Sequence, residues 1–329
     1  MRARDPLVVL VHGFLGEPHD WEPMRGALAS AGMSDVMAVD MLDCARRQGC
    51  ADALARAAHL DPEALAGAHG AAALPVGGRE HADAAMRVRV PSDTPFEATS
   101  QGDGLDALAC ALESHIDDAA SAATRDGRPI VLCGYSLGGR VCLALAGRAQ
   151  AAAGHARAGG AREMAAFIVI GADPGIDELR ERSLRAGRDH AHATHLLSDP
   201  DGFIAAWYAQ PLFASLRASP EFDRVVARRR AGLSRRSSRE MWAQILDACS
   251  PGRCAPRWGV AAQCGHRLAF VHGALDDKFS AIARRIHACA PDVPTISIPG
   301  AGHAAHVEQP QACADAVASI IAASVPHRT

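Results

Sequence analysis

One serine stands in a setting that can make its hydroxyl group reactive. The sequence GYSLG, residues 134–138, follows the apolar stretch 129–134 and precedes the Ala/Leu-rich stretch 136–149. A G-x-S-x-G sequence between a strand and a helix holds its serine on a strained turn, and the glycines let the strand and the helix approach closely. We therefore predict that Ser136 is exposed above the edge of a sheet and is catalytic.

A reactive serine needs a base, and the base needs an acid that orients it. Residues 268–272 form an apolar stretch that leads to Asp276, and residues 295–298 form another that leads to His303. Parallel sheets place their sites at the carboxyl ends of the strands. Asp276 is therefore the predicted acid and His303 the predicted base.

Each of these assignments has an alternative in the sequence. Asp277 or Asp173 can serve as the acid, and Asp276 can instead be the N-cap of a helix. His306 is the rival base, but we expect it to lie one turn into the last helix and to face elsewhere.

A glycine-containing turn also follows the first apolar stretch, in the sequence VHGFLG at residues 11–16. In enzymes with a G-x-S-x-G turn, the amide of such a loop and the amide of the residue after the serine form an oxyanion hole. The predicted donors are the backbone amides of Phe14 and Leu137. His12 is better interpreted as a residue that orders the loop.

Strand-like and helix-like segments alternate along the chain. The predicted strands are residues 6–11, 35–40, 129–134, 166–171, 268–272 and 295–298, and the predicted helices are residues 21–31, 105–123, 136–149 and 312–323. Such alternation favours a mostly parallel, doubly wound sheet, covered on both faces. Together with the chain order serine, acid, histidine, it predicts the α/β-hydrolase fold.

Two segments interrupt this alternation. Residues 44–100 are rich in Ala and Gly and predict one or two short helices in a mobile excursion that at most borders the pocket. Residues 175–265 are helical in pattern and form the predicted cap, inserted after the fourth core strand, so that residues 1–174 and 266–329 form the hydrolase core. Arginines crowd part of the cap, as a solvated helix face or as a lining for an anionic substrate; they are Arg224, Arg228, Arg229, Arg230, Arg235, Arg236 and Arg239.

The composition excludes several partners. Of the 329 residues, 34 are Lys or Arg and 37 are Asp or Glu, which gives a net charge of −3 and no reason to expect nucleic acid or an anionic membrane. No apolar stretch approaches the roughly 18 residues of a transmembrane helix. The apolar run near the start leads into a His-Gly turn rather than a cleavage site, so we expect no signal peptide and a cytoplasmic location.

The ten cysteines are then expected to be free thiols. Cys249, Cys254, Cys264 and His266 are a possible zinc site, but their spacings miss the usual Cys-x2-4-Cys pairs. We therefore predict no bound metal.

These motifs together resemble one family of the fold, the 2-succinyl-6-hydroxy-2,4-cyclohexadiene-1-carboxylate synthases of menaquinone biosynthesis. The resemblance lies in HGFLGEPHDW, GYSLGGRV, WYAQPLFASL, DDKF and PGAGHAAHVEQP. The motif WYAQPLFASL, residues 207–216, and Arg140 directly after GYSLGG are the most restrictive parts, because HGF, GYSLGG and GH occur widely among hydrolases.

The resemblance implies a lyase that needs no metal and no organic cofactor. It would eliminate pyruvate from 2-succinyl-5-enolpyruvyl-6-hydroxy-3-cyclohexene-1-carboxylate, a small molecule with three carboxylates. Ser136, made basic by His303, would take the ring proton beside the succinyl ketone, and the resulting enolate would lie in the oxyanion hole. By the same resemblance the substrate-binding residues would be Tyr135, Arg140, Arg185, Trp207 and Arg228, although each can instead be a core or surface residue.

The chain departs from the family pattern after Asp40, where Asp-Leu-Pro-Gly-His-Gly is replaced by DMLDC. Because that loop normally borders the pocket, the substrate stays open. A carboxylesterase or carbon–carbon bond hydrolase with Ser136 as nucleophile is one alternative, and a non-catalytic scaffold that binds a ligand is another. The sequence does not indicate an oligomeric state.

Overall fold

One parallel sheet organises the chain. The computed structural model describes residues 6–60, 103–119, 128–153 and 164–325. Six strands lie in the order β2-β1-β3-β4-β5-β6, and every neighbouring pair is parallel. They are β1 (Leu7–Val11), β2 (Val36–Val39), β3 (Ile130–Tyr135), β4 (Met164–Ile170), β5 (Leu268–Gly273) and β6 (Thr295–Ile298). All six predicted strands are present, and the predicted doubly wound sheet is confirmed.

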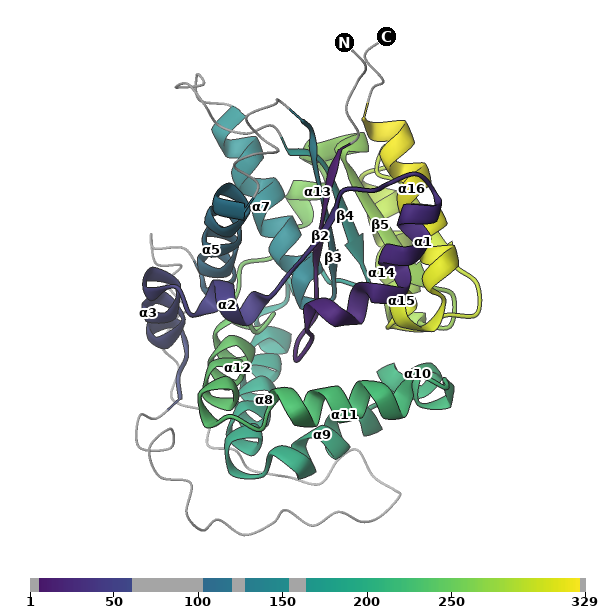
Figure 1. Ribbon diagram of the computed structural model, residues 1–329. Coiled ribbons are helices and arrows are strands. Elements are labelled where there is room, and N and C mark those ends of the chain that lie inside the picture. Colours follow the sequence, from purple (N-terminus) through teal and green to yellow (C-terminus); the bar gives the residue numbers. More distant parts are fainter. Residues whose placement is uncertain (1–5, 61–102, 120–127, 154–163, 326–329) are drawn as a thin grey trace.

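Helices cover both faces of this sheet (Figure 1). One face carries α1 (Glu22–Ser30) and α16 (Pro310–Ser324). The other carries α5 (Gly104–Ala119), α7 (Leu137–Ala153), α13 (Trp258–Cys264) and α14 (Asp277–Cys289). The short elements η1 (Pro18–Trp21), η3 (Gly265–Arg267) and α15 (Ala305–Glu308) complete the core.

The side chains of β1 show why its residues form a buried strand. Val8 and Leu10 pack into the layer of α1 and α16, whereas Val9 and Val11 pack into the layer of α5 and α7. Since successive side chains of a strand point to opposite faces, a strand covered on both sides needs a continuous apolar run. The same reasoning applies to β3 and β4, which are buried along almost all their length.

A group of helices follows β4 and lies across the carboxyl edge of the sheet (Figure 1). We call these elements the cap helices; they are α8 (Leu179–Ser198), α9 (Pro200–Ala209), η2 (Pro211–Phe213), α10 (Ala214–Ala218), α11 (Phe222–Gly232) and α12 (Arg236–Ala248). Their place after the fourth core strand is the predicted one. No helix in the described ranges is long and apolar enough to cross a membrane.

The segment after β2 begins with two short helices. Asp40 accepts a hydrogen bond from the Leu42 amide at 2.8 Å and caps α2 (Met41–Ala45), and α3 (Gln48–Ala57) follows. Leu54 of α3 is fully buried in the main core. The helix α3 agrees with the short helices predicted for this segment, and a few well-spaced apolar side chains suffice to anchor it; the mobility of the segment stays a prediction. Residues 61–100 of the segment lie outside the described residues.

We expect Leu54→Ala to destabilise the protein by about 2–5 kcal/mol, because it leaves a cavity in a closely packed core. Urea unfolding measures the free energy directly. Arg56→Ala, a change at an exposed position of the same helix, serves as the control and should stay within about 0.5 kcal/mol. Equal stability of the two variants would show that the Leu54 side chain does not anchor α3 in the core.

Candidate active site

Ser136 lies on a strained turn between β3 and α7. Its φ is +51°, in the left-handed region that residues other than glycine rarely adopt. Packing holds it there: a Cβ atom on Gly138 would lie 2.2 Å from the Val11 carbonyl oxygen, and one on Gly134 would lie 2.4 Å from the Gly138 carbonyl carbon. The glycines of the motif are therefore required for the close approach of strand and helix, as predicted.

The structure brings the predicted serine, histidine and aspartate together. His303 Nε2 lies 3.3 Å from Ser136 Oγ, and His303 Nδ1 lies 3.2 Å from Asp276 Oδ2. Asp276 also accepts a hydrogen bond from the Phe279 amide at 3.1 Å as the N-cap of α14, so both interpretations of this residue hold. This geometry can move a proton from the serine hydroxyl to the imidazole.

Neither of the alternative acids bonds to His303 in the part of the chain that the structure describes. Asp277 is exposed in the first turn of α14. Asp173 accepts a hydrogen bond from the Gly175 amide at 2.9 Å and pairs with Lys278 at 3.2 Å. Asp276 is thus the carboxylate that faces His303.

His303 lies in an aromatic setting that favours its neutral form. Only 4% of the residue is exposed. Its ring stacks on Phe279 at a centroid distance of 4.9 Å and contacts Tyr135 at 5.2 Å. Burial lowers the pKa of His303 from its ordinary value, although the hydrogen bond to Asp276 opposes this effect. At neutral pH the imidazole is therefore ready to accept a proton.

We expect kcat/KM to fall as pH falls, with a midpoint below 6.5, the ordinary value for histidine. The sign follows because a base with a lowered pKa is inactive only below that pKa. Lys278→Gln should move the midpoint upward, since Lys278 helps to lower the pKa of His303. Rates measured between pH 4.5 and 8 give both midpoints. A wild-type midpoint above 6.5 would assign the essential base to another group.

The loop after β1 carries Phe14, one of the two predicted oxyanion donors, and the other, Leu137, begins α7 directly after Ser136. His12 is fully buried, accepts the Met41 amide on Nε2 at 3.1 Å and donates from Nδ1 to the Gly13 carbonyl at 2.9 Å. This residue therefore orders the loop, as predicted. Within the described ranges, the amides of Phe14 and Leu137 donate to no protein group, so both are available to a developing oxyanion.

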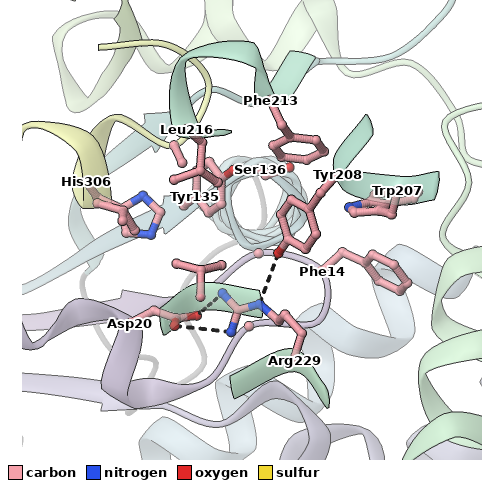
Figure 2. A pocket seen from close by; sticks show the side chains of 15 residues that line it. Phe14, Asp20, Tyr135, Ser136, Trp207, Tyr208, Phe213, Leu216, Arg229 and His306 are labelled. Atoms are coloured by element: carbon pink, nitrogen blue, oxygen red, sulfur yellow. Dashed lines mark hydrogen bonds and ion pairs between the residues drawn. The ribbon is translucent and has the colours of Figure 1, made fainter. Parts of the chain in front are cut away.

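A small pocket of about 40 Å³ opens at Ser136. Figure 2 shows its aromatic wall, formed by Phe14, Tyr135, Trp207, Tyr208 and Phe213. Two of the residues predicted to bind substrate, Tyr135 and Trp207, therefore line the pocket. Burial raises the pKa of Tyr135 far above its usual range, so its hydroxyl group keeps its proton.

One arginine lies inside this pocket, and it is not the predicted one. Arg229 of α11 is buried and binds both carboxylate oxygens of Asp20, at 3.1 and 2.6 Å, and the Tyr208 hydroxyl at 3.2 Å (Figure 2). Arg228, the predicted residue, points instead toward Glu17 and lines a neighbouring cavity. One step along a helix turns a side chain by about 100°, so the run of three arginines, Arg228, Arg229 and Arg230, did not reveal which of them faces the pocket.

The other two predicted arginines have protein partners. Arg140 is buried on α7 and donates to the Cys249 carbonyl at 2.6 Å. Arg185 of α8 binds Asp189 at 2.7 Å. Neither is among the described residues that line the Ser136 pocket, and a contact of either with substrate stays a prediction.

His306 faces the pocket, contrary to expectation. It lies in α15, a separate helix of four residues, because the backbone of Gln309 leaves the helical conformation before α16 begins. Its ring packs between Trp21 and Tyr135, at centroid distances of 4.4 and 4.2 Å. Burial lowers the pKa of His306 to about 3. It is a neutral part of the pocket wall, while His303 is the histidine that bonds to Ser136.

The sequence is similar to named enzymes over much of its length. The model of the "Alpha/beta hydrolase family" matches residues 8–316. The 2-succinyl-6-hydroxy-2,4-cyclohexadiene-1-carboxylate synthase of Enterobacter sp. (strain 638) is 34% identical over 191 residues, 58% of this chain and 66% of that protein. The enzyme of the same name from Klebsiella pneumoniae (strain 342) is 33% identical over 192 residues, 58% of this chain and 68% of that protein. The chain thus spans just under two thirds of the first of these relatives.

Solved structures agree on the fold. MenH from S. aureus superposes with a TM-score of 0.65 at 18% identity, covering 99% of this chain and 98% of that one. A thermophilic esterase from Thermogutta terrifontis superposes with a TM-score of 0.57, also at 18% identity, covering 99% and 92%. With the family match over residues 8–316 and the Ser-His-Asp arrangement at the sheet edge, these similarities show that the chain belongs to the α/β-hydrolase family.

Proposed function

We propose that the protein is a carbon–oxygen lyase that releases pyruvate from 2-succinyl-5-enolpyruvyl-6-hydroxy-3-cyclohexene-1-carboxylate and forms 2-succinyl-6-hydroxy-2,4-cyclohexadiene-1-carboxylate. The observation that carries the proposal is the set of arginines in the cavity that adjoins the Ser136 pocket, Arg46, Arg228 and Arg235; Arg229, which lines both spaces, is paired with Asp20. A substrate with several carboxylates needs such groups, whereas simple esters suit an apolar lining. The similarity to synthases of this name supports the same reaction.

In the proposed reaction Ser136 acts as a base rather than as a nucleophile. Its hydroxyl proton moves to His303 Nε2 while its oxygen takes the ring proton beside the succinyl ketone. Asp276 keeps Nδ1 protonated and stabilises the imidazolium that forms. The electrons of the broken C–H bond pass into an enolate, whose oxygen meets the amides of Phe14 and Leu137.

The enolate then expels the leaving group. Its electrons form a double bond between ring carbons 2 and 3, the existing double bond shifts from carbons 3 and 4 to carbons 4 and 5, and the carbon–oxygen bond from carbon 5 to the enolpyruvyl group breaks. The departing pyruvate enolate takes up a proton, and the proton held by the Ser136–His303 pair balances the cycle. No bond between Ser136 and substrate forms at any step.

Purified protein incubated with the enolpyruvyl substrate tests the proposal. We expect stoichiometric pyruvate, measured with lactate dehydrogenase, and an absorbance from the new diene. Mass spectrometry of the quenched reaction should show unmodified Ser136. No pyruvate release together with rapid ester hydrolysis through an acyl group on Ser136 would instead support the carboxylesterase alternative.

We also propose that the enzyme works in the cytoplasm as a soluble protein with a small-molecule substrate. All ten cysteines are free, which is usual in a reducing compartment.

A further inference from the structure

The pocket at Ser136 is too small for the substrate proposed above. Its volume is about 40 Å³, whereas small-molecule sites usually measure roughly 300–1,000 Å³. A second cavity of about 290 Å³ lies beside it. Gly16 and Arg229 line both spaces, so the two adjoin at the loop that follows Phe14. Only the two together offer the room that a substituted ring needs.

An aromatic wall joins the two spaces. Trp242 of α12 lines the second cavity, and its ring meets Phe14 edge to face at a centroid distance of 5.3 Å. Phe14 in turn lines the Ser136 pocket. Leu15 and Gly16, which follow Phe14 in the same loop, line the second cavity.

The second cavity is lined by arginine side chains that have few or long contacts with protein groups. Arg46 is half-exposed and bonds to the buried Ser238 hydroxyl at 3.1 Å and to exposed Asp43 at 3.2 Å. Arg235, at the N-cap of α12, is exposed and has no side-chain partner among the described residues. The contacts of Arg228 are long, at 3.5 Å with Glu17, 3.6 Å with Asp20 and 3.5 Å with the His19 carbonyl.

The two acids that line the same cavity, Asp40 and Glu17, already have protein partners. Asp40 accepts the Leu42 amide at 2.8 Å and lies 3.8 Å from His12 Nε2. Glu17 faces Arg228. Arg46 and Arg235 therefore remain available for an anion that enters from the Ser136 side, and guanidinium groups bind carboxylates through paired hydrogen bonds.

We propose that this second cavity binds the terminal carboxylate of the succinyl arm through Arg46 and Arg235. The proposal rests on the function proposed above, which puts the succinyl ketone at the Phe14 amide. Two methylene groups separate that ketone from the terminal carboxylate, so the arm extends past Leu15 and Gly16. The two arginines come from different parts of the fold: Arg46 is the C-cap of α2, and Arg235 is the N-cap of α12 in the cap.

The position of Arg46 gives the unusual segment after Asp40 a role. Its helix α2 stands where the chain departs from the Pro-Gly-His-Gly pattern of the family that it resembles. The replacement thus brings a guanidinium group to the border of the pocket. Arg46 and Arg235 are specificity-determining residues in this proposal, and neither belongs to the proton-transfer machinery.

A pair of stable ligands tests the site without turnover. 2-Succinylbenzoate carries the same arm on an aromatic ring, and 2-butanoylbenzoate lacks only its terminal carboxylate. By calorimetry, Arg235→Ala and Arg46→Ala should each weaken binding of the succinyl compound about tenfold, which is modest because both side chains contact water. Binding of the butanoyl compound should change less than twofold.

Arg236→Ala is the matched control, because Arg236 is the neighbour of Arg235, pairs with Glu240 on the surface and is not among the lining residues. It should leave both affinities unchanged. An equal loss for the two ligands, or no loss for either, would overturn the proposal. If the wild type released no pyruvate, but the Arg46→Ala and Arg235→Ala variants lost affinity only for the succinyl compound, the proposed reaction would be wrong and the carboxylate site would be supported.

For turnover of the enolpyruvyl substrate, the same two variants should raise KM about tenfold and leave kcat within about twofold, since the arm carboxylate is bound equally in ground and transition states. A loss confined to kcat would contradict this assignment.

Discussion

Ser136→Ala is expected to lower the rate of pyruvate release by about four orders of magnitude or more while the protein stays folded. Members of a Ser-His-Asp arrangement act as a unit, so that loss of one removes most of the proton transfer. The hydroxyl lies 3.3 Å from His303 Nε2, and this is the hydrogen bond that the alanine variant would lose. Single-turnover rates with the enolpyruvyl substrate, beside circular dichroism spectra, measure both parts of the prediction.

The neighbouring aspartates provide a matched control for the same mechanism. Asp276→Asn should lose activity severely, because an amide favours the wrong tautomer of His303. Asp277→Asn, one residue later and exposed, should retain nearly full activity. The reverse pattern would show that the acid has been assigned to the wrong residue.

Arg229→Ala is expected to destabilise the fold by about 3–5 kcal/mol. Arg229 and Asp20 are both buried and share two hydrogen bonds, and removal of one partner leaves a buried charge without its counter-ion. Burial acts to raise the pKa of Asp20, but Arg229 overrides this effect and holds the pKa below its usual value. Urea unfolding at pH 7 measures the loss. Arg230→Ala, at the exposed pair with Asp201, should cost less than about 1 kcal/mol.

A double variant separates stability from binding. Arg229→Met combined with Asp20→Leu removes both charges and should recover most of the lost stability, since apolar pairs often replace buried ion pairs without cost. It should not recover substrate affinity if the guanidinium group also serves the pocket. A double variant as unstable as Arg229→Ala would mean that packing, rather than charge, causes the loss.

The sequence predicted the parts of the site that depend on local order. Ser136, Asp276 and His303 each follow an apolar strand. Because parallel strands end at one edge of the sheet, this sequence pattern predicts that the three side chains lie close together. His12 as a loop-ordering residue followed from the same reasoning. The strands themselves were predicted to within one or two residues, because their burial on both faces demands uninterrupted apolar runs.

What the sequence did not reveal depends on long-range geometry. Asp20 and Arg229 are 209 residues apart in the chain, and neither lies in a sequence motif that predicts its partner. The choice between Arg228 and Arg229 depends on the rotation of a cap helix. His306 was misplaced because one non-helical residue, Gln309, separates its short helix from the last one. The anchoring of α3 by Leu54 was hidden by the Ala-rich composition around it.

The positions of the three catalytic candidates along the chain have a consequence for synthesis of the protein at the ribosome. Ser136 follows β3, Asp276 follows β5 and His303 follows β6, and β4 must pair between them. A nascent chain that has released β1 to β4 already holds the reactive serine turn, but it lacks both its base and its acid. The growing polypeptide is therefore catalytically silent until β6 has joined the sheet. Recovery of activity after dilution from denaturant therefore reports completion of the whole sheet and not merely formation of its centre.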